Sequence, residues 1–171
     1  MYQRSTGFNT SAILRGRADA FANVHGSAEF ARINGSVKFY QTARGVLTVA
    51  EIFGLPVSEE KCSGGIFAFH IHNGASCSGD QEDPFSEAGS HYDTDNCPHP
   101  SHAGDMPPLF GAKGTAFLAF LSDRFTISDI IGKTVIIHDK ADDFTTQPSG
   151  NSGNKIACGE IIENIHRPMP I

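Results

Sequence analysis

Short runs in which apolar and polar residues alternate constrain the fold of this chain most strongly. Apolar residues take every second position from Ala18 to Val24 and again from Ile33 to Phe39, the pattern of a half-buried β-strand. Further β-rich runs cover 46–53, 65–72, 114–121, 134–138 and 155–162, and turn residues separate them. Residues 127–131 fit either a helical turn or a loop that crosses the sheet. The sequence therefore predicts an all-β sandwich or barrel of seven to eight short strands.

Two polar segments interrupt this pattern. Residues 73–109 are rich in Gly, Ser, Asp, Asn, Pro and His and have almost no periodic apolar signal, and residues 142–154 form a second polar stretch. Loops of such length inside a compact domain are usually functional or disordered. We therefore look for function mainly in these two segments and in the strands beside them.

Composition excludes several classes of protein. The net charge of −6 argues against a nucleic-acid binder that relies on phosphate contacts. No apolar run is long enough for a membrane-spanning helix. Met1–Gly16 contains no secretory signal, so we expect a cytoplasmic protein, or an extracytoplasmic one if a signal has been removed. The 171 residues suit one domain, and four cysteines in a cytosolic chain are usually thiols, ligands or catalysts.

Histidines provide the clearest functional signal. His70 and His72 lie two positions apart on a predicted strand, so both side chains point to one face, about 7 Å apart. That spacing suits two ligands of one metal, or equally two polar residues on a solvated face. The long polar segment adds three histidines and an aspartate, a donor set that suits tetrahedral zinc: His91, His99, His102 and Asp105. His138 ends an apolar strand, whereas we take His25 and His166 as ordinary polar residues.

Five motifs in order resemble the copper/zinc superoxide dismutases, and most closely their bacterial branch. The motifs are FHIH (69–72), GSHYD (89–93), HAGDMPPL (102–109), GKTVIIHDKADDF (132–144) and GNSGNKIACGEI (150–161). The resemblance implies a Greek-key β-sandwich or flattened barrel of seven to eight antiparallel strands with two long functional loops. It also implies a family domain over 18–163, an N-terminal extension over 1–17 and a tail over 164–171.

The resemblance assigns ligands to two metals. It implies that copper is held by His70, His72, His91 and His138. It implies that zinc is held by His91, His99, His102 and Asp105. Asp142 takes the position of a carboxylate that links ligand imidazoles of the two sites. The gap from His99 to His102 is shorter than the family usually has, so His99 is the least typical ligand.

The implied activity is dismutation of superoxide to oxygen and hydrogen peroxide by one-electron cycling of a His-ligated copper bridged to a structural zinc. In the family, His91 leaves copper on reduction, takes up a proton and so acts in catalysis. The alternative is a copper- and zinc-binding protein without turnover, such as a metal store or a structural domain. For the enzyme, the expected partner is the superoxide anion, and neither a nucleic acid nor a membrane is expected as a partner. The family also allows a homodimer.

Lys155 departs from the family pattern. The family has an arginine three positions before its last cysteine, beside the copper, where it guides and holds superoxide; here the residue is lysine. The positive charge is kept, but the planar guanidinium is lost, so we expect activity with a weaker anion site. Lys133 and Lys140 either help Lys155 to attract superoxide or are ordinary solvated turn residues.

The four cysteines are expected to divide into two pairs. The resemblance implies a disulfide between Cys77 and Cys158. Cys62 and Cys97 lie outside the family pattern, and they either form a second disulfide that pins the shortened zinc loop or stay as free thiols.

Overall fold

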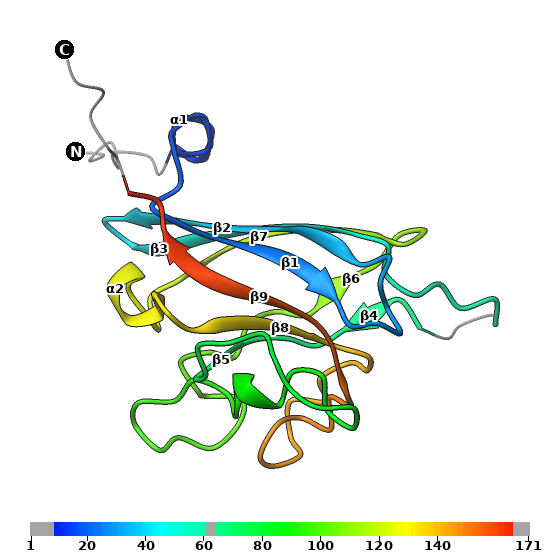
Figure 1. Ribbon diagram of the computed structural model, residues 1–171. Helices are drawn as coiled ribbons and strands as arrows, with labels where there is room; N and C mark the ends of the chain where they lie inside the picture. The colour runs from blue at the N-terminus through cyan, green and yellow to red at the C-terminus, as the bar shows by residue number, and fades with distance from the viewer. Residues whose placement is uncertain (1–8, 61–63, 166–171) are drawn as a thin grey trace, which may run out of the picture.

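A seven-stranded antiparallel sheet forms the body of the protein. The computed structural model describes residues 9–60 and 64–165, and Figure 1 shows the arrangement of its elements. In the order β5-β8-β9-β1-β2-β3-β7, the sheet contains β5 (Phe69–His72), β8 (Thr134–His138), β9 (Lys155–Glu163), β1 (Ala20–Gly26), β2 (Asn34–Thr42), β3 (Gly45–Phe53) and β7 (Thr115–Ser122). The expected all-β architecture is therefore confirmed.

The strand that comes last in the sequence among those of this sheet lies inside the sheet. β9, drawn red in Figure 1, runs between β1, drawn blue, and β8, drawn yellow. All neighbouring strands pair antiparallel. The sheet curls so that its inward side chains enclose one apolar core.

The alternation seen in the sequence explains the core. Ala20, Ala22 and Val24 of β1 are buried, whereas Asn23 and His25 between and after them are exposed. On the neighbouring strand, Val37 pairs with Ala22 and Phe39 pairs with Ala20. Full burial of a side chain such as Phe39 stabilises the fold by roughly 1.5–3 kcal/mol. Residues two apart thus reach the same core from both strands.

The predicted strand over 65–72 is not continuous, and that expectation is wrong. It divides into β4 (Ile66–Phe67), which pairs with β6 (Leu109–Phe110) in a separate small sheet, and β5, which pairs with β8. Ala68 lies at the division, where its amide donates to the Lys140 carbonyl and its carbonyl accepts from the His138 amide. The backbone therefore changes partners at Ala68.

Helices are short. α1 (Thr10–Arg15) precedes the sheet, and the side chain of Asn9 accepts a hydrogen bond from the Ala12 amide at its start. α2 (Ile127–Ile130) shows that the segment 127–131 is a helical turn. A 3₁₀ turn, η1 (Ser86–Ala88), lies in the long polar loop. No helix within 9–60 and 64–165 is long and apolar enough to cross a membrane.

The two polar segments fold over the same part of the sheet. In Figure 1 the green loop after β5 and the orange loop after β8 gather beside these two strands. A small apolar cluster formed by Phe85, Ala88, Ile136 and Cys158 packs the long loop onto the sheet. The expected disulfide between Cys77 and Cys158 is present, with the two Cα atoms 5.6 Å apart. The loops are therefore anchored over the face of β5 and β8 that carries histidines.

Candidate metal centre

β5 and β8 present three histidines to the loops. His70 and His72 lie on one face of β5 with ring centroids 6.4 Å apart, as their spacing predicts. His138 ends β8, where the register with β9 shifts after Ile137. All three rings are buried, because the long loop covers this face. The alternative of a solvated polar pair at His70 and His72 is therefore wrong.

The long loop adds ligands by running alongside β5 as short strand-like pieces. The Tyr92 amide donates to the Ile71 carbonyl, and the Ile71 amide donates to the Gly104 carbonyl. These contacts put His91 opposite His72 and Asp105 opposite His70. Gly104 permits the approach, because a Cβ atom there would lie 2.3 Å from the Ile71 carbonyl oxygen.

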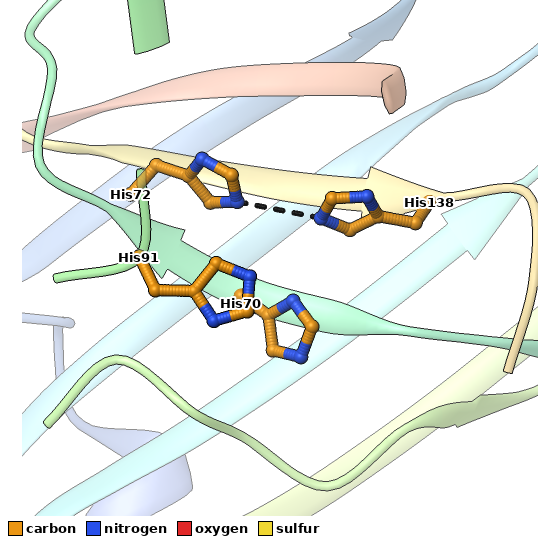
Figure 2. A group of neighbouring side chains, drawn as sticks. All are labelled: His70, His72, His91 and His138. Atoms are coloured by element: carbon orange, nitrogen blue, oxygen red, sulfur yellow. Dashed lines mark hydrogen bonds between the residues drawn. The ribbon is translucent and has the colours of Figure 1, made fainter. Parts of the chain in front are cut away.

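The first group of ligands contains His70, His72, His91 and His138, shown in Figure 2. Their candidate ligand atoms all lie within 4.8 Å of one another. His72 Nδ1 donates to the Gly89 carbonyl at 2.8 Å, and His138 Nδ1 donates to the Gly153 carbonyl at 3.5 Å. Because carbonyls only accept, both Nε2 atoms carry lone pairs.

Those two lone pairs face each other. His72 Nε2 and His138 Nε2 are 3.3 Å apart, the contact dashed in Figure 2. His70 Nδ1 and His91 Nε2 are buried beside them without a hydrogen-bond partner in the described structure. Buried polar atoms are rarely left unpaired, and a cation among these four nitrogens would satisfy all of them. Four imidazoles suit copper, so the residues fit the metal that the sequence implies.

The imidazoles of His70, His72 and His138 are held in the neutral form that binds metal. The pKa of His138 is lowered to about 3, mainly by burial and in addition by the neighbouring His70 and His91. Burial, with His138 and His91 nearby, also takes the pKa of His72 well below its ordinary value. The pKa of His70 is lowered by burial, although its hydrogen bond with Asp142 acts in the opposite direction.

The second group of ligands converges on the carboxylate of Asp105. His91 Nδ1 lies 2.8 Å, His99 Nδ1 3.1 Å and His102 Nδ1 3.2 Å from its oxygens. Burial raises the pKa of Asp105, but the His91 hydrogen bond and the nearby imidazoles outweigh it and lower the pKa overall. Three imidazoles and one carboxylate within 4.8 Å of one another fit a tetrahedral zinc site.

His91 belongs to both groups. Its Nδ1 faces Asp105 and its Nε2 faces the other three histidines. One imidazole therefore offers one nitrogen to each candidate metal position.

Asp142 connects the two groups a second time. One of its oxygens lies 2.8 Å from His70 Nε2 and the other 2.8 Å from His99 Nε2. Burial raises its pKa, but hydrogen bonds from His70, the Phe144 amide and His99 outweigh burial and lower it to about 2. The carboxylate thus orients one ring of each group, a role that carboxylates often have beside metal ligands.

Two further loop residues hold the segment around His99, which the sequence marked as the least typical ligand. Gln147 accepts from the His99 amide at 2.9 Å and donates to the His99 carbonyl at 2.7 Å. Arg124 donates to the carbonyls of Pro100 and His102 at 2.9 and 3.3 Å. Sequence reasoning missed Gln147 and Arg124, because a single side chain that binds loop carbonyls leaves no periodic or motif signal.

A cavity of about 480 Å³ opens beside the first group of histidines. It reaches His72, His91 and His138, and its rim includes Lys155. The Lys155 ammonium forms an ion pair with the carboxylate of Asp83. The sequence analysis did not identify Asp83, whose only local signal is an Asp-Pro turn.

The other lysines lie elsewhere. Lys133 donates to the Asn73 side chain at 2.8 Å and lies over the ring of Tyr92, and Lys140 is exposed. Neither lines the cavity. Their placement favours the interpretation of ordinary turn residues.

The remaining cysteines and histidines lie apart from these groups. Cys97 is a free, half-buried cysteine in the described structure. Cys62, the partner considered for it in a second disulfide, lies outside the described residues. His25 is exposed, with its ring against Phe85. His166 also lies outside the described residues.

Comparisons with known proteins agree with this geometry. The sequence model of the copper/zinc superoxide dismutase family matches residues 33–161. A copper/zinc superoxide dismutase of Legionella pneumophila is 33% identical over 135 residues, which cover 74% of this chain and 76% of the relative. The superoxide dismutase-like protein YojM of Bacillus subtilis is 36% identical over 116 residues, 59% of this chain and 58% of the relative.

One solved structure is also similar. It is the crystal structure of a superoxide dismutase-like protein from Bacillus subtilis in which histidines replace a tyrosine and a proline. The TM-score is 0.67 at 29% sequence identity, and the match covers 83% of this chain and 96% of the other.

Proposed function

The chain belongs to the copper/zinc superoxide dismutase family, and we propose on this basis that it dismutates superoxide to oxygen and hydrogen peroxide. The proposed copper ligands are His70, His72, His91 and His138. The proposed zinc ligands are His91, His99, His102 and Asp105.

One observation carries this proposal: a single buried imidazole, His91, belongs to both ligand groups. A protein that needed zinc only to order its loop would have no use for four imidazole nitrogens gathered in this way, two of them buried without a hydrogen-bond partner in the described structure. The facing Nε2 atoms of His72 and His138, 3.3 Å apart, support a cation between them.

Bound copper would supply one-electron redox chemistry, and zinc would fix the orientation of the shared imidazole. Residues of the chain form the route by which a small anion reaches the site, and one of them can hold a proton for the substrate. His72, His91 and His138 line the cavity, whereas His70 lies behind them, fully buried. A small anion therefore approaches from the side of these three rings.

His91 is the residue placed to move a proton. Its Nδ1 faces the zinc ligands, which leaves Nε2 as the atom that can hold a proton, and the ring reaches the cavity. Formation of hydrogen peroxide consumes protons, so a proton on His91 Nε2 can pass directly to the reduced substrate. Asp142 keeps His70 oriented through its Nε2, so that Nδ1 points at the ligand group.

A second function is supported by the relatives named superoxide dismutase-like. Such a protein would bind copper and zinc without turnover. This chain has a histidine at each proposed copper position, which favours the enzyme.

Metal content and activity measured on the same sample test the proposal. We expect copper and zinc each in equimolar ratio to the chain, with rapid superoxide consumption in a stopped-flow assay. His138→Gln should lose copper and activity while keeping zinc. His25→Gln, which removes a histidine outside both groups, is the matched control and should keep all three.

Two results would contradict the enzyme. Full copper loading without superoxide consumption would favour the binding protein. Zinc binding alone, with no copper uptake from excess copper, would contradict both the enzyme and the copper site.

A further inference from the structure

We infer that Asp83 weakens the binding of small anions in the cavity by pairing with Lys155. The Asp83 carboxylate then occupies the cationic group that a substrate or inhibitor anion would otherwise contact. The inference rests on the proposed function. It concerns Asp83, a residue to which neither the ligand groups nor the family motifs assign a role.

The ion pair forms part of the cavity wall. Asp83 and Lys155 both line it together with His91 and His138. The Lys155 side chain is only 16% exposed, whereas that of Asp83 is 39% exposed. The Lys155 side chain is therefore mostly enclosed by protein, and Asp83 is the more exposed partner of the pair.

Asp83 is held in position by its own loop. Its Oδ1 accepts from the Phe85 amide at 3.1 Å, which leaves Oδ2 for Lys155. Its carbonyl accepts from the amides of Asp80 and Ser86 at 3.1 and 3.0 Å. The carboxylate is thus part of a hydrogen-bonded turn, and its pairing with Lys155 needs little further ordering.

The disulfide fixes this turn against the strand that carries Lys155. Cys77 belongs to the Asp83 loop, and Cys158 lies on β9, which begins at Lys155. Phe85, two residues after Asp83, packs against Ile136 and Cys158. Loop and strand therefore form one unit in which carboxylate and ammonium face each other.

The other charges around the cavity are also negative. Glu82 and Asp93 line it as well, and Lys155 is the one Lys or Arg in its lining within the described residues. Among the lining side chains, three carboxylates outnumber one paired ammonium, so these side chains by themselves do not draw an anion toward the ligand groups. Lys155 was expected to guide anions to the ligand groups. According to this inference, Asp83 competes with an entering anion for the Lys155 ammonium.

This competition predicts weak binding of small anions. An entering anion must displace Asp83 from Lys155 or bind beside its negative charge. Removing the carboxylate should free the ammonium and tighten anion binding. Partly exposed ion pairs contribute up to roughly 1 kcal/mol, which corresponds to about a fivefold change in affinity.

Azide binding to the copper- and zinc-loaded protein tests the inference. Azide would be titrated and followed by the visible absorption of copper(II) in the wild type, Asp83→Asn, Glu82→Gln and Lys155→Met. We expect Asp83→Asn to tighten azide binding by about fivefold. Glu82→Gln removes the same charge from the same cavity without breaking an ion pair to Lys155, so its effect should be clearly smaller.

The double variant identifies the partner. In the Lys155→Met background, Asp83→Asn should change azide affinity no more than Glu82→Gln does. An equal gain with and without Lys155 would overturn the inference, because Asp83 would then act only as a general negative charge.

A second measurement does not need bound copper. Reductive methylation of Lys155, quantified by peptide mass spectrometry, should be faster in Asp83→Asn than in the wild type, while methylation of Lys133 stays unchanged. Unchanged methylation together with unchanged azide affinity would refute the inference. The protein could consume no superoxide while Asp83→Asn still tightens azide binding and speeds the methylation of Lys155. That result would refute the proposed function and leave the inference on Asp83 standing.

Discussion

Replacing Asp142 with asparagine should weaken zinc binding more than any other change outside the ligands themselves. Asp142 accepts hydrogen bonds from His70 and His99, each at 2.8 Å, and from the Phe144 amide at 2.7 Å. An asparagine has one acceptor oxygen, and its amide group would oppose one of the two imidazole N–H groups. One ring must therefore rotate, move away or change its protonated nitrogen.

The ring that moves should be that of His99. His70 lies on β5, paired with β8 and fully buried, whereas His99 lies on the loop and is held there mainly by Gln147. Loss of a charge-assisted hydrogen bond costs about 1.5–3 kcal/mol. Loss of an outer partner of a metal ligand typically lowers metal affinity by about 10–100-fold, and the two magnitudes agree.

The assay is zinc competition with a chelator of known affinity at neutral pH. We expect Asp142→Asn to release zinc at a free concentration about 10–100-fold higher than the wild type does, with a smaller loss of copper affinity. Asp143→Asn is the matched control, because Asp143 is exposed and accepts from Thr145 and Thr146 but contacts no histidine among residues 9–60 and 64–165. Equal zinc affinities for wild type and Asp142→Asn, or equal losses in both variants, would show that this reasoning is wrong.

Two further predictions concern stability. Cys77→Ser should lower the free energy of unfolding by about 4 kcal/mol, because the disulfide spans 81 residues; urea unfolding should show this loss, and Cys97→Ser, which removes a free cysteine, should change little. The Thr126 amide and hydroxyl donate to Asp129 and lower the pKa of its carboxyl below 3.8. The ionised carboxylate therefore stabilises α2 above pH 3.8. This contribution disappears as the pH falls through the lowered pKa. Asp129→Asn should therefore be less stable than the wild type by a few tenths of a kcal/mol at neutral pH, and acid titration of unfolding should bring the two together; a constant difference down to pH 2 would contradict the assignment.

Strand positions could be predicted because each strand of the main sheet has one face in the core. The alternation in β1 and β2 survives in their burial patterns. β5 is different, since all four of its residues are buried. The core covers one face and the loops cover the other, so periodicity alone could not separate β5 from β4 at Ala68.

The ligands could be predicted because residue types that bind metals recur at spacings that suit a shared site. Histidines at strand spacing and an Asp three positions after His102 stand out against an ordinary composition. Asp83, Gln147 and Arg124 could not be predicted in the same way. Their roles depend on the position that a loop without a periodic pattern takes in the fold. That position is set by the disulfide, by buried Phe85 and by glycines such as Gly104 that permit close contacts.

The position of β9 determines when a newly synthesised chain can complete its fold. Among the strands of this sheet β9 is translated last, yet it joins β8 to β1 in the middle of the sheet. Until it leaves the ribosome, β1 has an open edge beside which β9 must later insert, and β5 with β8 forms a detached pair. Non-local pairing of this kind folds slowly, and open strand edges invite association with other chains. Lys155 and Cys158 also arrive with β9, so the ligand groups can be enclosed only after nearly all of the sheet has been translated.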